Sequence, residues 1–173
     1  MSKIAVGFAL AKNETLGHEL QAVLSIPPED LLARGRARAE SLDLSFAGAV
    51  YPPEAWALFQ SGAALLVDVR TIEERAFVGH VPQSLHVAWK FGTGMTQNPR
   101  FLREFEKIAP KDAVVLLLCR SGKRSSDAAE ALTKAGYTNA FNVLEGFEGE
   151  LDAQQHRGGH DGWRHWGLPW IQA

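Results

Sequence analysis

Residues 113–132 constrain the fold of this 173-residue chain more than any other stretch. They begin with an uninterrupted apolar run from Ala113 to Leu118, which is typical of a strand buried on both faces of a parallel sheet. From Ser125 the sequence predicts a helix, and Ser125, Ser126 or Asp127 is expected to cap it. A short loop therefore joins a central strand to a helix, at the sheet edge where open α/β proteins bind ligands on free N–H groups.

The loop contains the only cysteine of the chain. Cys119 ends the apolar run, and three cations follow it closely, Arg120, Lys123 and Arg124. A helix N-terminus and neighbouring cations both favour the ionised form of a thiol, so we expect a thiolate here. Gly122 lets the backbone turn sharply, with successive N–H groups facing inward as in an anion-binding nest.

The segment CRSGKRS, residues 119–125, resembles the active-site loop of the rhodanese (thiosulfate sulfurtransferase) family, in particular of its single-domain members. In that family a cysteine at the end of a central strand opens a six-residue loop whose N–H groups surround the sulfur. The resemblance implies that Cys119 is catalytic, takes a sulfane sulfur from thiosulfate or a similar donor, becomes a persulfide and passes the sulfur to cyanide or a thiol. No cofactor is implied. The expected substrate-binding residues are Arg120, Ser121, Gly122, Lys123, Arg124 and Ser125.

A second segment strengthens this resemblance. Residues 68–71 read Asp-Val-Arg-Thr, and the Gly-His-Val-Pro of residues 79–82 follows, similar to the family's DVR and GH[IV]P signature. Asp68 and Arg70 are expected to support the sheet end and the loop rather than to take part in the chemistry. Arg124 is a further candidate for such a supporting role, because its side chain can hold the loop by bonding to Asp68 or to Glu74. One departure is the Glu-Gly at residues 145–146, where family members often have Gly-Gly.

Strand and helix patterns alternate from residue 44 to the end of the chain and predict a rhodanese-like α/β domain over residues 44–173. We expect a doubly wound parallel sheet of about five strands with helices on both faces. The strands are expected near residues 47–50, 63–69, 84–87, 113–118 and 139–144.

Residues 1–43 are predicted to form an N-terminal helical extension. Asn13 is expected to cap a first helix, and Pro28, followed by two acidic residues, to begin a second. Amphipathic helices usually bury one face, so we expect the pair to pack on the domain. An arm that docks a partner is the alternative.

Composition limits the partners. The chain has a net charge of −2, so the cations of the loop are a local feature of a slightly acidic protein. This pattern favours a small anionic sulfur donor over nucleic acid. No apolar run is long enough to cross a membrane. Residues 1–14 contain a brief apolar patch, but Lys12 and Glu14 follow it without a cleavage site, so we expect a cytoplasmic protein.

Metal and dithiol chemistry are not expected. A single cysteine excludes a disulfide within the chain and a Cys-rich zinc site. His156, His160 and His165 are irregularly spaced and have no cysteine beside them. We therefore predict no metal site.

Three alternatives stay open. A lone cysteine at a strand end is commonly a small buried apolar residue, although the polar neighbours of Cys119 argue against this. Phosphatases of the dual-specificity and cell-cycle types have a similar loop, with five residues between cysteine and arginine; here four separate Cys119 from Arg124. A persulfide carrier or sensing module that passes its sulfur to a protein acceptor would use the same residues.

Overall fold

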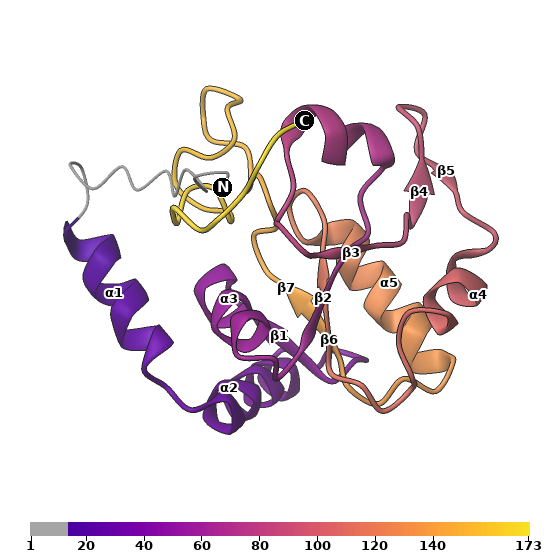
Figure 1. The fold of residues 1–173 in the computed structure, drawn as a ribbon, viewed down its shortest axis with the longest axis horizontal. Helices are drawn as coiled ribbons and strands as arrows, with labels where there is room; N and C mark the ends of the chain where they lie inside the picture. Colours follow the sequence, from indigo (N-terminus) through magenta and orange to yellow (C-terminus); the bar gives the residue numbers. More distant parts are fainter. Residues whose placement is uncertain (1–13) are drawn as a thin grey trace.

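Five parallel strands form the central sheet (Figure 1). The computed structural model describes residues 14–173. The strand order is β1-β7-β6-β2-β3, so β6, which precedes the cysteine loop, lies in the middle. The predicted sheet is confirmed, and each strand falls within the range expected from the sequence. The bounds are Gly48–Val50 for β1, Leu65–Asp68 for β2, Leu85–His86 for β3, Val115–Leu118 for β6 and Ala140–Val143 for β7.

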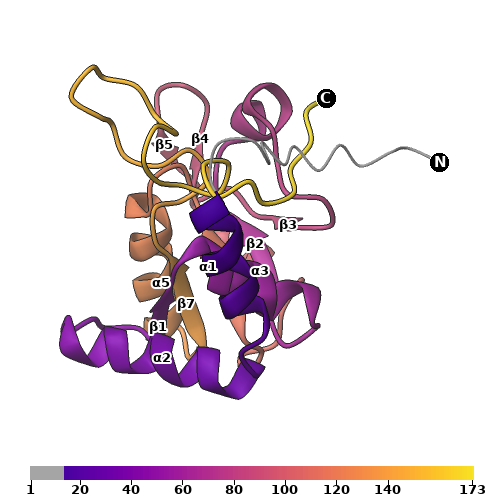
Figure 2. The same ribbon diagram turned by 90° about the vertical axis from the view of Figure 1, so that its left-hand side faces the viewer.

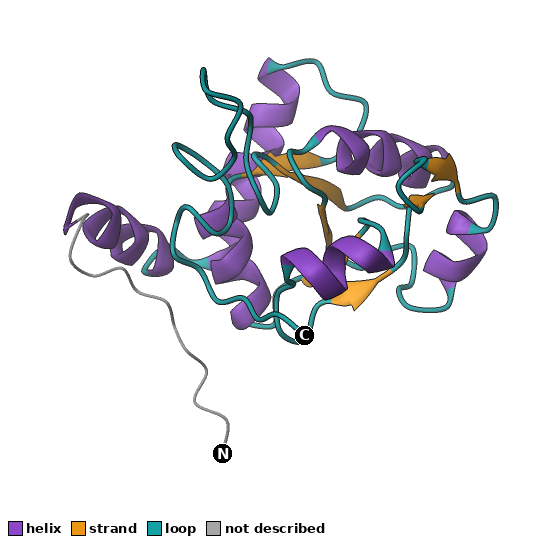
Figure 3. Cartoon of the chain, turned by 90° about the horizontal axis from the view of Figure 1, so that it is seen from above, coloured by secondary structure: helices purple, strands orange, loops and turns teal. Residues whose placement is uncertain are grey.

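Helices cover both faces of the sheet, as predicted (Figures 2 and 3). One core lies on the side of α1, α2 and α3, and the other on the side of α4 and α5. Leu116 and Leu118 of β6 belong to the first core, and Val115 and Leu117 to the second, which explains why this strand has no polar position. The helices are α1 (Glu14–Leu24), α2 (Pro28–Ser41), α3 (Pro52–Gln60), α4 (Phe101–Glu106) and α5 (Lys123–Lys134).

The register of the middle strands brings polar residues to one edge. Asp68, the last residue of β2, pairs with Leu118 of β6. On the other side of β6, Asn142 of β7 pairs with Leu117. Cys119 follows Leu118 directly, so Asp68 and Asn142 flank the cysteine from the two neighbouring strands.

The start of α5 differs from the prediction. The helix begins at Lys123, two residues before Ser125, and its N-cap is Gly122 with a φ of 98°. Among the described residues, no side chain makes a capping hydrogen bond there. The expected caps were wrong because a left-handed glycine turns the chain straight from the loop into the helix. Ser125 thereby enters the first turn, where its hydroxyl serves other partners.

The two N-terminal helices pack on the rest of the protein. Leu20 of α1 and Leu31 of α2 are buried in the core on the α3 side. At Gly35, α2 comes so close to the sheet that an added Cβ would lie 3.0 Å from Val50 of β1. The predicted start of α2 at Pro28 is confirmed, whereas the expected cap Asn13 lies outside the described residues. The division of the chain at residue 43 stays a prediction.

Two elements were not foreseen. A π-helical turn, η1 (Glu74–Val78), follows β2, and a short antiparallel hairpin is formed by β4 (Lys90–Phe91) and β5 (Thr96–Gln97). None of the helices within residues 14–173 is both long and apolar enough to cross a bilayer.

We predict that Gly48→Ala destabilises the protein by about 1–3 kcal/mol, the usual cost of overpacking a core. An alanine Cβ would collide with Cε1 of Phe141, whose ring is fully buried. Urea unfolding measures this change. Gly17→Ala in α1 is the matched control: its Cβ meets nothing within 4 Å among the described residues, so we expect no loss and a gain of up to about 1 kcal/mol from helix propensity. Equal effects of the two variants would contradict the packing described at β1.

Candidate active site

Cys119 lies at the end of the middle strand with its sulfur turned toward the loop that follows. Its Sγ accepts a hydrogen bond from the Gly122 N–H, with a donor–acceptor distance of 3.1 Å. The hydroxyl oxygen of Ser125 lies 3.2 Å from the same sulfur. The residue is only 1% exposed and continues the core formed by Val115 and Leu117. The thiol is therefore buried, as a purely structural cysteine would be, yet polar groups of the loop face it.

The carbonyl groups at the start of the loop are held by the segment after β7. The Phe147 N–H donates to the Cys119 carbonyl at 2.8 Å, and the Glu148 N–H donates to the Arg120 carbonyl at 3.0 Å. At Gly146, an added Cβ would come within 2.6 Å of both carbonyl oxygens, so a side chain there would push the segment off the loop. These contacts hold the first two loop carbonyls against residues 146–148.

Glu145 stands where family members often have the first glycine of a Gly-Gly turn. Its φ is 68°, a left-handed conformation that is uncommon for a residue with a Cβ. Its carboxylate accepts hydrogen bonds from the Gly162 N–H at 3.0 Å and from the indole N–H of Trp166 at 2.9 Å. These two bonds tie the turn to the C-terminal tail and offset the backbone cost. The tail tryptophans accordingly pack on their own protein, with Trp163 fully buried.

Arg124 holds the loop to η1. Its guanidinium makes two hydrogen bonds to the carboxylate of Glu74, at 2.7 and 2.9 Å. Burial acts to raise the pKa of Glu74, but the hydrogen bonds and the charge of Arg124 outweigh it, and the pKa is lowered. Of the two acids that the sequence offered to Arg124, the structure selects Glu74. Arg124 thus has a loop-holding contact, and the expectation that it also binds substrate remains a prediction.

Asp68 and Arg70 form a fully buried ion pair beside the loop. The Arg70 guanidinium donates to both carboxylate oxygens of Asp68, and Arg75 adds a bond of 3.0 Å. Burial acts to raise the pKa of Asp68, yet the charge and hydrogen bonds of Arg70 lower it. Arg70 also donates to the Gly79 carbonyl at 2.7 Å and lies over the ring of Phe147, 4.3 Å from its centre. Through Phe147 the pair contacts the segment that holds the Cys119 carbonyl.

The other loop residues lie at or near the surface. Lys123 is exposed in the first turn of α5, whereas Arg120 and Ser121 are half-buried. The Nε atom of Arg120 is buried and has no hydrogen-bond partner within the described part of the chain. Gly122 and Lys123 border a groove of about 380 Å³ whose apolar wall is formed by Leu42, Leu44 and Phe46.

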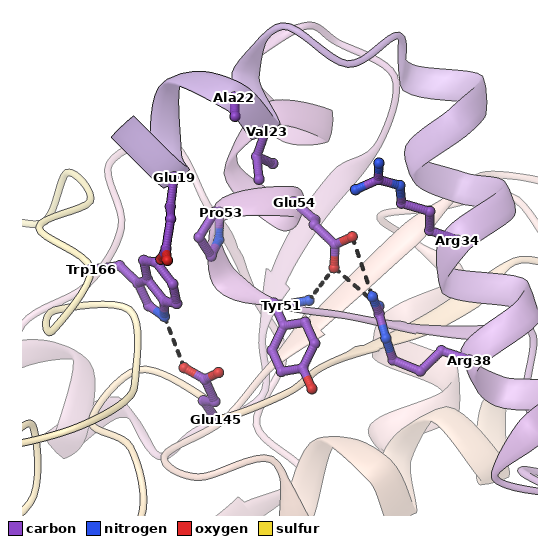
Figure 4. Close-up of a pocket in the computed structure, with 10 residues that line it drawn as sticks. All are labelled: Glu19, Ala22, Val23, Arg34, Arg38, Tyr51, Pro53, Glu54, Glu145 and Trp166. Carbon is purple, nitrogen blue, oxygen red and sulfur yellow. Dashed lines mark hydrogen bonds and ion pairs between the residues drawn. The ribbon is translucent and has the colours of Figure 1, made fainter. Parts of the chain in front are cut away.

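A separate cavity of about 450 Å³ lies between α1, α2 and the start of α3 (Figure 4). Arg38 and Glu54 form an ion pair of 3.0 Å on one side, and Trp166 bonds to Glu145 on the other. Among the described residues, its lining includes none of the loop residues 119–125. It adjoins the Glu145 turn and does not belong to the cysteine site.

Sequence reasoning missed Asn142 and Phe147. Asn142 is 5% exposed; its Oδ1 lies 2.6 Å from the Ser125 hydroxyl, and its Nδ2 donates to the Gly122 carbonyl at 3.2 Å. Both residues reach the loop from or just after β7, far away in the sequence. The adjacency of β6 and β7 was the signal needed to find them.

The fold and the site define an open α/β protein with a cysteine loop at the carboxyl edge of its sheet. The family model of the rhodanese-like domain matches residues 51–151, and the chain belongs to this family.

Named relatives and a solved structure agree with this assignment. The chain is 37% identical over 119 residues to an uncharacterized RP600 homolog of Rickettsia rickettsii, covering 65% of this chain and 87% of that one. It is 32% identical over 105 residues to the thiosulfate sulfurtransferase GlpE of Haemophilus influenzae, covering 61% and 89%. The crystal structure of Rv0390 from M. tuberculosis is 45% identical with a TM-score of 0.67, covering 74% and 99%.

We predict that Glu74→Gln lowers stability at pH 7 and that this loss disappears in acid. A carboxylate whose pKa is lowered on folding stabilises the protein above its ordinary value of 4.5, and this contribution is lost as the pH falls through the folded value. Urea unfolding of both proteins at pH 7, 5 and 3 measures it.

Glu130→Gln is the control, because Glu130 pairs with Lys134 on the exposed side of α5. It should change stability little at any of these pH values. A loss in Glu74→Gln that is equally large at pH 3 would refute the role of the charge.

Proposed function

We propose that the protein is a sulfurtransferase that moves a sulfane sulfur from thiosulfate, or a similar anionic donor, to a nucleophilic acceptor through a persulfide on Cys119. The observation that carries this proposal is the family's cysteine, set at the end of the middle strand with the Gly122 N–H and the Ser125 hydroxyl facing its sulfur. The relatives named as thiosulfate sulfurtransferases support the choice of donor.

The first half-reaction loads the sulfur. The Cys119 thiolate attacks the outer sulfur of thiosulfate, a new S–S bond forms, and the S–S bond of thiosulfate breaks. Sulfite leaves with the electron pair, and the protein holds a persulfide whose negative charge lies on the outer sulfur. Preorganised N–H donors stabilise such an anion without rearranging, which is the main source of rate in sites of this kind.

The second half-reaction returns the enzyme to its starting state. A nucleophile such as cyanide attacks the outer sulfur, the persulfide S–S bond breaks, and the Cys119 thiolate leaves with the electron pair. Thiocyanate is the product, and no net proton transfer is needed. A thiol acceptor, small or on a partner protein, reacts in the same way as its thiolate.

A phosphatase activity is disfavoured by the loop. Four residues separate Cys119 from Arg124, one fewer than in the dual-specificity and cell-cycle phosphatases, and the Arg124 guanidinium bonds to Glu74. A carrier role with a protein acceptor, and the cytoplasmic location, stay predictions. Removal of residues 1–43 is a poor test of such a partner, because α2 covers β1 and buries Leu31.

We predict that Cys119→Ser abolishes transfer of sulfur from thiosulfate to cyanide and leaves the fold intact. Intact mass after thiosulfate treatment should show a gain of one sulfur atom in the wild type, lost on adding cyanide, and no gain in the variant. Turnover of a phosphomonoester is measured beside it as the phosphatase control. Thiocyanate formation at the wild-type rate by the serine variant would overturn the assignment.

We also predict that Lys123→Gln raises the KM for thiosulfate about two- to fivefold with little change in kcat. An exposed cation near the loop attracts an anionic donor without taking part in bond breaking. The salt dependence of kcat/KM should become shallower. Lys134→Gln, at the opposite end of the same helix, is the matched control and should leave both quantities unchanged. Equal effects of the two variants would show that only the overall charge matters.

A further inference from the structure

The hydroxyl of Ser125 faces two acceptors at once. Its oxygen lies 3.2 Å from the Cys119 sulfur and 2.6 Å from Oδ1 of Asn142. A serine hydroxyl has one hydrogen to donate. It can therefore serve the sulfur or Asn142 at any moment, but not both.

The amide of Asn142 has a fixed orientation. Its Nδ2 donates to the Gly122 carbonyl at 3.2 Å, which leaves Oδ1 to face Ser125 as an acceptor. The Gly122 N–H in turn donates to the sulfur. With a protonated thiol the four residues form a closed ring of hydrogen bonds, in which Cys119 donates to Ser125 and Ser125 donates to Asn142.

Ionisation of Cys119 breaks this ring. A thiolate has no hydrogen to donate, so the Ser125 hydroxyl turns to the sulfur and Oδ1 of Asn142 loses its donor. Ser125 is fully buried and Asn142 is 5% exposed, so an unpaired Oδ1 is costly. In the persulfide the negative charge lies on the outer sulfur, so the inner sulfur no longer needs the Ser125 hydroxyl. Ser125 then donates to Oδ1 of Asn142, and that oxygen keeps its partner.

Three of the arginines in this part of the protein are paired with carboxylates. Arg124, on α5, is close enough for its charge to interact with Cys119, but its guanidinium bonds to Glu74 of η1. Arg70 and Arg75 both bond to Asp68 at the end of β2. Arg120 and Lys123 on the loop add positive charge. None of these cations accepts a hydrogen bond, so the single hydroxyl hydrogen of Ser125 still goes either to Cys119 or to Asn142.

We propose that Asn142 is a positioning residue that competes with Cys119 for the single hydrogen of Ser125 and thereby favours the persulfide over the free thiolate. The part that concerns the persulfide rests on the proposed function. The part that concerns the thiolate does not depend on it. Asn142 acts through Ser125 and the only change it requires is rotation of one hydroxyl.

The test compares Asn142→Leu with Asn142→Asp, each with and without Ser125→Ala. Both replacements remove the N–H that binds the Gly122 carbonyl, but only leucine removes the acceptor for Ser125. Two quantities are measured: the thiolate-to-thiol ratio at one fixed pH, from ultraviolet absorbance, and the equilibrium constant for loading in mixtures of thiosulfate and sulfite, from intact mass. Cys119 is the only cysteine, so both signals are unambiguous.

We expect Asn142→Leu to raise the thiolate-to-thiol ratio about fivefold and to lower the loading constant by a similar factor, the size of one net hydrogen bond. Asn142→Asp should not raise the ratio. In the Ser125→Ala background, where no hydrogen is contested, leucine in place of Asn142 should change each quantity less than twofold. Asn142→Ala provides the same comparison if the leucine variant unfolds.

The proposal would be overturned if the leucine effect were the same with and without Ser125. That result would mean that Asn142 acts only through the shape of the loop. Failure of the wild type to gain a sulfur would instead refute the proposed function, and the thiolate titration would still decide the role of Asn142.

Discussion

The hydrogen bonds from residues 147 and 148 to the first two carbonyls of the loop are the contacts on which the site depends. Without these two bonds, carbonyl groups of the loop as well as its N–H groups would be free to face the sulfur of Cys119. With the Cys119 and Arg120 carbonyls bound by the Phe147 and Glu148 N–H groups, the loop is free to direct the Gly122 N–H at Sγ. Gly146 permits this contact because any Cβ would collide with the same carbonyls.

Ion pairs between arginines and carboxylates hold the segments around the loop in place. The carboxylate of Glu74 pairs with Arg124, and the carboxylate of Asp68 pairs with Arg70 and Arg75, so these three arginines are neutralised by carboxylates. Since the pKa of each carboxyl is lowered, both pairs persist through the neutral range. The cations left to meet an anionic donor are those nearer the surface, above all Lys123.

The sequence predicted the sheet well because its strands are continuous apolar runs. Val115 to Leu118 have a core on each side, and a pattern without polar positions reflects that directly. The loop was found through residue types and spacing. The predicted helix cap was wrong because serine is a good cap in isolation, whereas here the Ser125 hydroxyl faces Cys119 and Asn142. Those contacts depend on the adjacency of β6 and β7, and local patterns carry no information on strand order.

Burial of the cysteine fits a two-step transfer better than a direct one. Cys119 is 1% exposed, so in the proposed cycle the donor must bring its outer sulfur down to Sγ. The acceptor need not go as deep, because a persulfide places the reactive sulfur about 2 Å farther out, one S–S bond beyond Sγ. The buried inner sulfur then keeps the hydrogen bond from the Gly122 N–H, while the outer sulfur carries the charge and meets the acceptor.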